Sequence, residues 1–278
     1  MTVTHAQPFV STPANEQLLK QMLCYLHSGY SVHLQGPGGI GKTTLALQLA
    51  DRLASPATLL RPVPDTGQSL SGPAATAAPA LPQAGTLIYD DFEQAGPQVQ
   101  AVLLAMLDEQ QSRYQEAAES ARQTILVSNP DLRLMASCDL QTTSAKLRDR
   151  LITLSLPEPD TLTQQQILMQ KARVEAAAAL KIVQLKQRFL QQTSAESAAS
   201  LRPGIMIAQI CQQQRIPIDL ESTDFRAVCR DVLLSRASCS LLEANEILWT
   251  VFNWLDRRDL AMPAAPRSRA LAGADSAT

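Results

Sequence analysis

Charged side chains are scarce in this sequence. Asp, Glu, Lys and Arg make up 18% of the 278 residues, and the formal net charge is -2. A protein whose main partner is DNA or RNA needs a field of basic side chains to hold the phosphate backbone. This composition supplies no such field, so we expect no nucleic-acid partner.

Residues that bind metals or form disulfides are also few. The three histidines are too dispersed for a metal site, and the five cysteines show no CxxC spacing. We therefore expect reduced thiols in a cytosolic protein rather than a disulfide framework. The residues concerned are His5, His27, His33, Cys24, Cys138, Cys211, Cys229 and Cys239.

Long apolar runs are absent as well. No run reaches the length that crosses a bilayer, and the N-terminus lacks the basic-then-apolar pattern of a signal peptide. We expect a cytoplasmic protein with no membrane partner. The chain is long enough for one large domain or two small ones, with a sizeable core.

The most informative stretch that is present is rich in glycine. It reads Gly36-Pro37-Gly38-Gly39-Ile40-Gly41-Lys42-Thr43 and fits G-x-x-x-x-G-K-[ST], the Walker A loop. The glycines let backbone N–H groups close around phosphate oxygens. Lys42 brings a positive charge to the β- and γ-phosphates, and the Thr43 hydroxyl can ligate Mg²⁺. Thr44, the next residue, belongs to the expected nucleotide site.

The surroundings of this loop favour the phosphate-binding interpretation. A strand-like run, Tyr30–Gln35, precedes it, and a good helix former, Thr44–Ala50, follows it. Strand, loop and helix are what the mechanism requires, because the helix N-terminus also favours an anion. The alternative is a glycine-rich turn with an incidental lysine.

Two adjacent carboxylates follow a later apolar strand, Thr86–Asp91. Asp90 stands where a Walker B aspartate holds Mg²⁺, usually through water. Asp91 would orient the attacking water, although many ATPases of this kind have the longer glutamate there. The alternative is an ordinary polar strand terminus. The expected metal ligands are thus Thr43 and Asp90.

Four further polar residues are candidates for contacts with the γ-phosphate. Asn129 follows a buried-type strand and could act as sensor 1, or it could only form an Asn-Pro turn. Arg148 and Arg150 precede the last strand and could reach the γ-phosphate of a neighbouring subunit. Arg202 begins a later helix and could act as sensor 2. The alternative for the arginines is solvated surface charge.

Strands and helices alternate in the first half of the sequence. This alternation predicts a parallel sheet covered by helices on both faces, an α/β sandwich of the P-loop NTPase type over residues 1–157, with an N-terminal arm in residues 1–29. A helix is expected over Asn15–His27, capped by Asn15. The expected strands are Tyr30–Gln35, Thr58–Val63, Thr86–Asp91, Thr124–Ser128 and Leu151–Leu156.

Strand patterns disappear after Pro159, and we expect a small α-helical domain over residues 158–258. A capping box of Thr163 and Gln166 predicts the start of the first helix. The tail, 259–278, is rich in Pro, Ala and Ser and is expected to be disordered. The expected helices are Thr163–Gln192, Pro203–Gln214, Asp224–Arg236 and Ser240–Arg257.

These elements, in this order, resemble the AAA+ ATPases of the MoxR group, and most closely the gas vesicle protein N (GvpN) family. The similarity covers most of the chain from Phe9 to about Arg236. Beyond the Walker A loop, it is carried by the stretches Phe9–Pro13, Tyr25–Pro37, Leu87–Phe92, Ser128–Pro130, Leu147–Thr153, Ser200–Ala208 and Asp231–Arg236.

The resemblance implies an ATPase that uses ATP and Mg²⁺, forms a ring, with a hexamer expected, and assists assembly of the gas vesicle shell. Its partners would be further copies of itself and gas vesicle shell or accessory proteins, so a gas vesicle location is a further expectation beside the cytoplasm. Arg150 would be the better arginine finger and Arg148 the reserve. The adenine would lie near Val10 in the arm, and the helical domain would act as a lid.

Two departures from the family keep other functions open. Ser55–Gly85, where such rings grip a polypeptide, is short and low in complexity, and Asp91 replaces the usual glutamate. Slow hydrolysis is therefore expected. One alternative is a nucleotide-gated adaptor or structural protein with little turnover. Another is a MoxR-type activator of a different client, such as rubisco.

Overall fold

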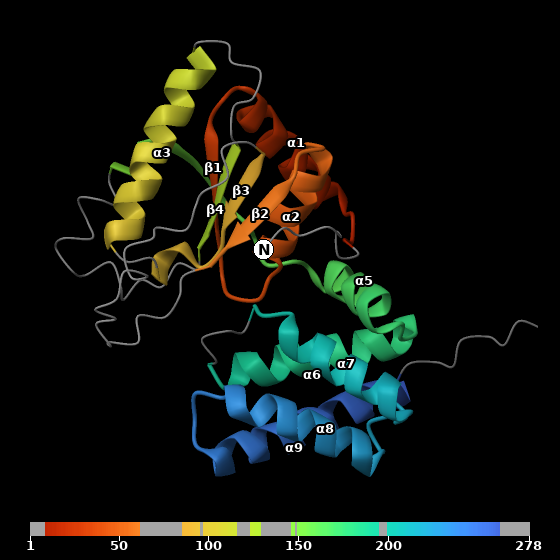
Figure 1. The fold of residues 1–278 in the computed structure, drawn as a ribbon. Coiled ribbons are helices and arrows are strands. Elements are labelled where there is room, and N and C mark those ends of the chain that lie inside the picture. Colours follow the sequence, from red (N-terminus) through yellow and green to blue (C-terminus); the bar gives the residue numbers. More distant parts are fainter. Residues whose placement is uncertain are drawn as a thin grey trace, which may run out of the picture.

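The fold is that of a computed structural model that describes residues 9–61, 85–94, 97–115, 123–128, 146–147, 149–194 and 199–261. Five parallel strands form one sheet in the order β2-β3-β4-β1-β5 (Figure 1). The strands are β1 (Ser31–Gln35), β2 (Ala57–Leu60), β3 (Thr86–Tyr89), β4 (Gln123–Ser128) and β5 (Leu151–Ser155). This sheet confirms the predicted α/β class.

The register brings the carboxyl ends of the strands to one edge of the sheet. Val32 of β1 pairs with Ile125 of β4 on one side and with Ile152 of β5 on the other. Strand β4 in turn pairs with β3, opposite Ile88. The loop after β1 and the carboxylates after β3 therefore leave the sheet on the same edge, where open α/β sheets bind ligands.

Helices cover both faces of the sheet (Figure 1). Helices α1 (Pro13–His27) and α2 (Lys42–Arg52) pack on one face through a cluster that includes Leu19, Leu34 and Leu45. Helix α3 (Pro97–Gln115) covers the other face through Leu103 and Met106. Burial on both faces explains why β3 carries a continuous buried run, whereas β1 alternates polar and apolar residues.

The second half is helical, as predicted, and has a core of its own. Its helices are α5 (Thr161–Ala172), α6 (Ala176–Gln192), α7 (Arg202–Gln214), α8 (Thr223–Leu233) and α9 (Leu241–Ala261), with a short 3₁₀ turn, η3 (Leu234–Arg236). Phe189, Ile207, Phe225 and Leu248 are among its buried side chains. In Figure 1 this helical part lies beyond the sheet edge from which the loop after β1 projects.

The prediction of one helix over Thr163–Gln192 was wrong. The chain breaks at Arg173, which adopts a left-handed φ of 55°, and α6 begins at Ala176. The break lets α5 fold back against α6, and tertiary packing of this kind overrides helix propensity. The predicted capping box was wrong too, because Asp160 is the cap and its Oδ1 accepts a hydrogen bond from the Thr163 N–H at 2.7 Å.

Two other helix starts show how capping depends on geometry. Thr12, and not Asn15, caps α1: its hydroxyl accepts a bond from the Asn15 N–H at 3.3 Å. At α9, whose start was predicted at Ser240, the Ser240 hydroxyl accepts a hydrogen bond from the Glu243 N–H at 3.3 Å. Helix α9 runs on to Ala261, and the rest of the predicted tail lies outside the described residues.

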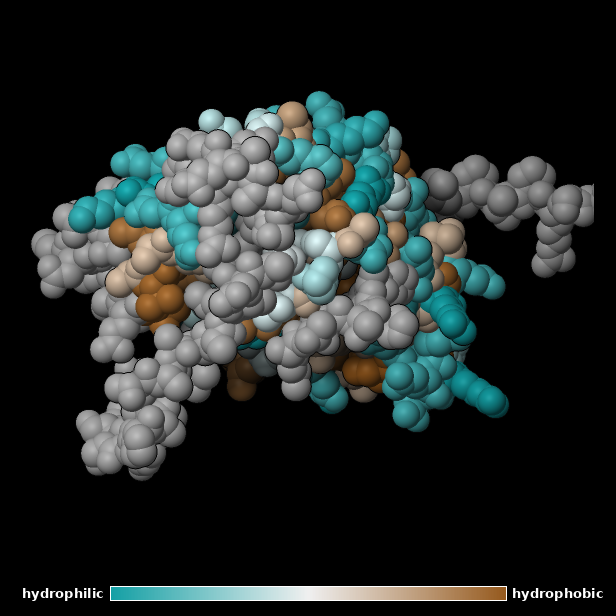
Figure 2. All heavy atoms as spheres, turned by 45° about the horizontal axis from the view of Figure 1, so that its top comes forward, coloured by the Kyte–Doolittle hydropathy of each residue, from teal (hydrophilic) through white to brown (hydrophobic). Residues whose placement is uncertain are grey.

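On the face seen in Figure 2, hydrophobic side chains lie in separate small patches among hydrophilic ones. Exposed large apolar side chains include Leu162, Leu241, Leu242 and Trp249. Within the described ranges, none of the helices combines the length and the apolar character needed to cross a bilayer.

Candidate nucleotide-binding site

The glycine-rich loop connects β1 to α2, the strand–loop–helix arrangement expected of Walker A. Gly39 and Gly41 both have left-handed φ values, 77° and 102°, which residues with a Cβ rarely adopt. Gly41 is also the N-cap residue of α2 and makes no side-chain cap. Helix α2 therefore begins at the loop, and the N-terminus of a helix favours an anion.

Lys42 is held at this loop. Its side chain is buried, at 6% exposure, and its Nζ donates to the carbonyl oxygens of Gly36 at 2.8 Å and Pro37 at 2.7 Å. Both of these acceptors are neutral backbone oxygens. A buried cation of this kind is poised to bind an anion.

Thr43 and Asp90 meet at the edge of the sheet. The Thr43 hydroxyl donates to Asp90 Oδ1 at 2.8 Å, across 47 positions in the sequence, and Asp90 is only 4% exposed. A hydroxyl next to a carboxylate is a donor set that suits Mg²⁺, which prefers oxygen ligands and keeps several waters. The residues present therefore fit both a phosphate and its metal ion.

Arg61 is a member of this site that the sequence analysis did not identify. Its Nε and Nη2 donate to Asp90 Oδ2 at 3.2 and 3.1 Å. The side chain is 59% exposed, whereas that of Asp90 is 6% exposed. Arg61 was overlooked because it fell inside the strand predicted over Thr58–Val63. Strand β2 ends at Leu60, so Arg61 stands at the carboxyl edge of the strand next to β3, and that position was the usable signal.

Asp91 starts a tight turn directly after Asp90. Its φ is 53°, a left-handed value that aspartate tolerates better than most residues. Its carbonyl oxygen accepts a bond from the Gln94 N–H at 2.9 Å, at the end of a short 3₁₀ helix, η1 (Phe92–Gln94). The side chain is half-buried beside the Walker B position.

The candidate arginine finger is bound within its own chain. Arg150 forms an ion pair with Asp108 of α3 and also donates to the Lys146 carbonyl at 2.9 Å. The Asp108 carboxylate raises the pKa of Arg150 further above its ordinary value. Arg148 and Asn129 lie outside the described residues.

The helical part reaches the phosphate loop next to Arg202. The Leu201 N–H donates to the Gly39 carbonyl at 3.0 Å, and the Ser200 hydroxyl accepts from the Arg202 N–H at 3.3 Å. Ser200 packs so closely that a Cβ added to Gly39 would lie 2.2 Å from its Oγ. The sequence analysis selected the exposed Arg202 and missed Ser200 as a contact of the loop.

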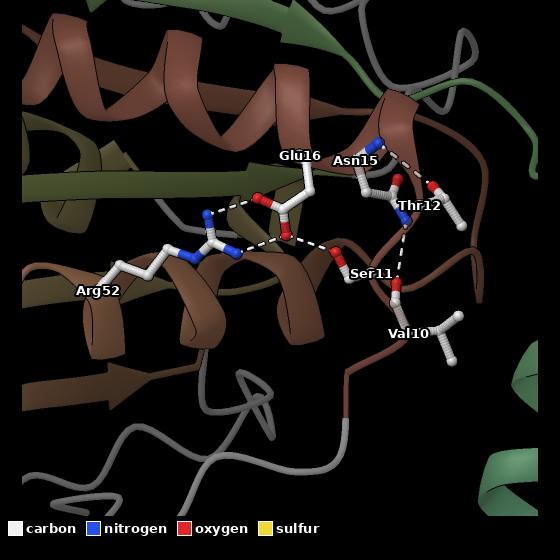
Figure 3. A network of polar contacts seen from close by, with 6 residues as sticks. All are labelled: Val10, Ser11, Thr12, Asn15, Glu16 and Arg52. Carbon is white, nitrogen blue, oxygen red and sulfur yellow. Dashed lines mark hydrogen bonds and ion pairs between the residues drawn. The ribbon is translucent and has the colours of Figure 1, made fainter.

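The N-terminal arm is fastened to α1 and α2 (Figure 3). The Val10 carbonyl accepts from Asn15 Nδ2 at 3.4 Å, and Glu16 pairs with Arg52 of α2 at 2.5 Å. Glu16 also accepts from the Ser11 hydroxyl, and Arg52 and Ser11 together lower the pKa of Glu16 to about 2. The arm is thus anchored on the helix that begins with Lys42.

Among the described residues, no three His, Cys, Asp or Glu side chains gather as a metal site would require. The four cysteines within the described ranges are free thiols.

Comparison with known proteins gives consistent relatives. No protein-family model matches the chain. The gas vesicle ATPase GvpN of Ancylobacter aquaticus is 24% identical over 82% of this chain and 73% of its own length. The denitrification regulatory protein NirQ of Stutzerimonas stutzeri is 26% identical over 76% of this chain and 82% of its own. A second GvpN, from Haloferax mediterranei, is 25% identical over 85% of this chain and 77% of its own.

Solved structures show the same fold. Domain III of the replication initiation protein DnaA of Thermotoga maritima matches with a TM-score of 0.56, at 14% identity, over 83% of this chain and 99% of that domain. The RuvB Holliday junction branch migration motor of Thermotoga maritima matches with a TM-score of 0.50, at 20% identity, over 81% of this chain and 70% of its own.

The expected AAA+ P-loop fold is confirmed by these findings together. Two of the relatives are named gas vesicle ATPases, and both solved structures match most of this chain. The chain therefore has the AAA+ P-loop NTPase fold and is a homologue of the gas vesicle ATPases GvpN and of NirQ.

Proposed function

We propose that this chain binds ATP with Mg²⁺ at the loop between β1 and α2 and hydrolyses it. The observation that carries the proposal is the meeting of three groups at one sheet edge: the buried Lys42 ammonium, the Thr43 hydroxyl and the Asp90 carboxylate. Lys42 would neutralise the terminal phosphates, while Thr43 and Asp90 would hold Mg²⁺, which supplies charge stabilisation when bound.

The remaining site residues are assigned roles on the same basis. Asp91 would orient the attacking water, and Asn129 would assist it as sensor 1. Because aspartate is one methylene shorter than glutamate, we expect slow turnover. Arg202 would contact the phosphates from the helical part, which would act as a lid. This role is supported by the bond between Leu201 and Gly39 directly beside it.

We further propose that the protein works as a ring, with a hexamer as the expected size, in which Arg150 or Arg148 serves the neighbouring site. In that role Arg150 must leave Asp108, so ring formation and the loss of this ion pair would be coupled. The expected task is assembly of the gas vesicle shell, and the names of the two GvpN relatives support it. Shell or accessory proteins of the vesicle would then be the partners.

A second client is favoured by a specific observation. NirQ matches this chain as well as the GvpN proteins do in identity, and its name assigns it to the regulation of denitrification. A MoxR-type activator of a metabolic enzyme is therefore the alternative function. Co-purification separates the two: gas vesicle shell proteins retained in an ATP-dependent manner support the first, and retention of an enzyme instead supports the second.

The decisive test of the site is an ATP-binding titration beside a steady-state ATPase assay. We expect the Lys42→Ala variant to bind ATP about 100-fold more weakly, because two or more charge-assisted hydrogen bonds to phosphate are lost. Lys20→Ala, which removes an exposed lysine of α1, is the matched control and should bind like the wild type. ATP binding that survives Lys42→Ala unchanged would refute the site.

The same pair of assays separates an enzyme from a nucleotide-gated adaptor. Tight ATP binding with measurable Mg²⁺-dependent release of phosphate supports the ATPase. Tight ATP binding without phosphate release would favour the adaptor. The lack of hydrolysis would then be attributed to Asp91.

A further inference from the structure

Lys186 is a buried charge that the proposed mechanism does not use. It lies on α6 at the centre of the helical part and is 1% exposed. Its Nζ donates to Gln164 Oε1 at 2.8 Å and to the Ser200 carbonyl at 3.0 Å. Burying an ammonium costs several kcal/mol, and an apolar residue of similar size would avoid that cost. The position therefore calls for a reason beyond packing.

The second acceptor of Lys186 leads to the phosphate loop. The Ser200 carbonyl belongs to the same peptide unit as the Leu201 N–H, and that N–H donates to the Gly39 carbonyl at 3.0 Å. The Gly39 carbonyl in turn belongs to the same peptide unit as the Ile40 N–H. Two peptide units thus connect the ammonium to the loop by consecutive hydrogen bonds.

The geometry of a trans peptide sets the direction of this chain of bonds. No cis peptide occurs in the described residues, and in a trans peptide the C=O and the N–H point in opposite directions. With its carbonyl held by Leu201, the Gly39–Ile40 peptide turns its N–H away from the helical part. Ile40 is within the run of loop amides that a Walker A sequence turns toward phosphate.

We propose that Lys186 is a positioning residue that strengthens phosphate binding from within the helical part, acting through the Ser200–Leu201 and Gly39–Ile40 peptides. The ammonium polarises the first peptide, which makes the Leu201 N–H a better donor to Gly39. That bond polarises the second peptide and makes the Ile40 N–H a better donor to an anion. The inference rests on the proposed ATP site and extends it to a residue in another part of the fold.

The coupling must be reciprocal. If the Lys186 charge favours phosphate in the loop, phosphate in the loop favours the charged form of Lys186 by the same free energy. Without nucleotide, burial lowers the pKa of Lys186 to about 8, and the Glu158 carboxylate opposes that shift. ATP affinity should then fall as pH rises through this range, because Lys186 loses the charge that acts on the loop through the two peptide units.

The groups around Lys186 leave this titration identifiable. Gln164 on α5 and the Ser200 carbonyl before α7 are neutral acceptors of Lys186. The buried thiols of Cys211 on α7 and Cys229 on α8 have pKa values raised by burial. From α9 the core receives apolar side chains such as Leu248 and Phe252.

The test compares ATP affinity at pH 7.5 in the wild type, Lys186→Met, Lys186→Gln and Lys181→Met. We expect Lys186→Met to weaken ATP binding about five- to tenfold. Lys186→Gln, which can still donate a hydrogen bond but has no charge, should weaken it similarly. Lys181→Met removes another lysine of α6 and should bind ATP like the wild type. Adenosine, which has no phosphate, should not distinguish the four proteins.

A pH series separates this role from a merely structural one. The ATP affinity of the wild type divided by that of Lys186→Met should fall toward one between pH 7.5 and 9.5, because Lys186 of the wild type loses its charge. The stability of the protein without nucleotide should instead increase with pH relative to Lys186→Met. The unfolded chain holds a proton on Lys186 up to about pH 10.4, so between about 8 and 10.4 the free energy of unfolding rises with pH relative to Lys186→Met.

Equal ATP affinity of the wild type and Lys186→Met at pH 7.5, or a ratio that stays constant with pH, overturns the inference. If Lys186→Met does not fold, as judged by its thermal transition, the smaller Lys186→Gln change carries the same comparison. Failure of the proposed function would give a different result. The wild type itself would then bind no ATP, and Lys42→Ala would cause no further loss of binding.

Discussion

The α/β part and the helical part of this molecule each bury a lysine, and the two are recognisable in different ways. Lys42 donates to the carbonyls of Gly36 and Pro37, and Lys186 donates to the Ser200 carbonyl and Gln164. In both cases these acceptors are neutral oxygens. Lys42 follows a glycine pattern that identifies it in any sequence, whereas nothing near Lys186 in the sequence indicates burial.

The comparison teaches that a nucleotide site in this fold extends beyond its motif. The Leu201–Gly39 bond joins the two parts at the phosphate loop, so the charge of one lysine acts at the loop directly and that of the other through backbone groups. The direct effect should be large and the indirect one small, which is the order expected for Lys42→Ala and Lys186→Met.

Among the remaining variants, the largest expected effect is on the rate of ATP turnover. It arises from a residue of the α/β part and should not involve the helical part. Asp91→Glu should raise kcat about three- to tenfold, because the added methylene brings the carboxylate nearer to the attacking water. ATP affinity should not change, since the contacts of the helical part with the loop are untouched. A steady-state ATPase assay beside an ATP titration checks both, and an unchanged or lower kcat would argue against Asp91 as the water-orienting residue.

The junction between the two parts can be broken at Gly39. Gly39→Ala should cost about 1–3 kcal/mol of stability, because alanine is strained at the φ of 77° and its Cβ meets the Ser200 hydroxyl. Urea unfolding of the nucleotide-free protein measures this. Adding Ser200→Gly removes the clash and should return part of the loss. A double variant no more stable than Gly39→Ala would mean that Ser200 does not press on the loop.

Gly41→Ala is the matched control for that experiment. Gly41 also has a left-handed φ, of 102°, but a Cβ there would meet no atom within 4 Å. Its cost should therefore be backbone strain alone, and Ser200→Gly should not relieve it. Equal relief of both variants would show that the effect of Ser200→Gly is unrelated to the contact.

The smallest effect is expected at Arg61. Its guanidinium pairs with Asp90, the proposed metal ligand, so it would compete with Mg²⁺ for that carboxylate. Arg61→Gln should lower the Mg²⁺ concentration for half-maximal ATP turnover about two- to threefold, because half-exposed ion pairs are weak. Arg52→Gln, which breaks the exposed pair with Glu16, is the control. A higher Mg²⁺ requirement in Arg61→Gln would assign Arg61 to nucleotide binding instead.

Local patterns predicted much of the fold. The apolar runs of β3 and β4 indicated buried strands of a parallel sheet, because strands covered on both faces need no polar alternation. Helix ends were less predictable. The break at Arg173 and the capping by Asp160 follow from how α5 packs on α6, and neither Thr163 nor Gln166 contained that information.

The candidate site also contains residues that were selected from the sequence and residues that were missed. Lys42, Thr43 and Asp90 were selected from sequence, and their contact in space follows from the positions of β1 and β3 in the sheet. Arg61 and Ser200 were missed as members of the site. Arg61 was missed because the strand was predicted to continue to Val63, and the contact of Ser200 with Gly39 depends on packing that the sequence does not show.

By itself the sequence determined the strand, the glycine loop and the helix that follows it, because backbone freedom at Gly39 and Gly41 and the adjacent Lys42 are local properties. Tertiary structure alone decided which distant groups face that loop. Asp90, Leu201 and, through Ser200, Lys186 come to it from separate strands and helices, and their contacts depend on how the elements pack. Packing is a sum over the whole chain, and no short stretch of sequence contains it.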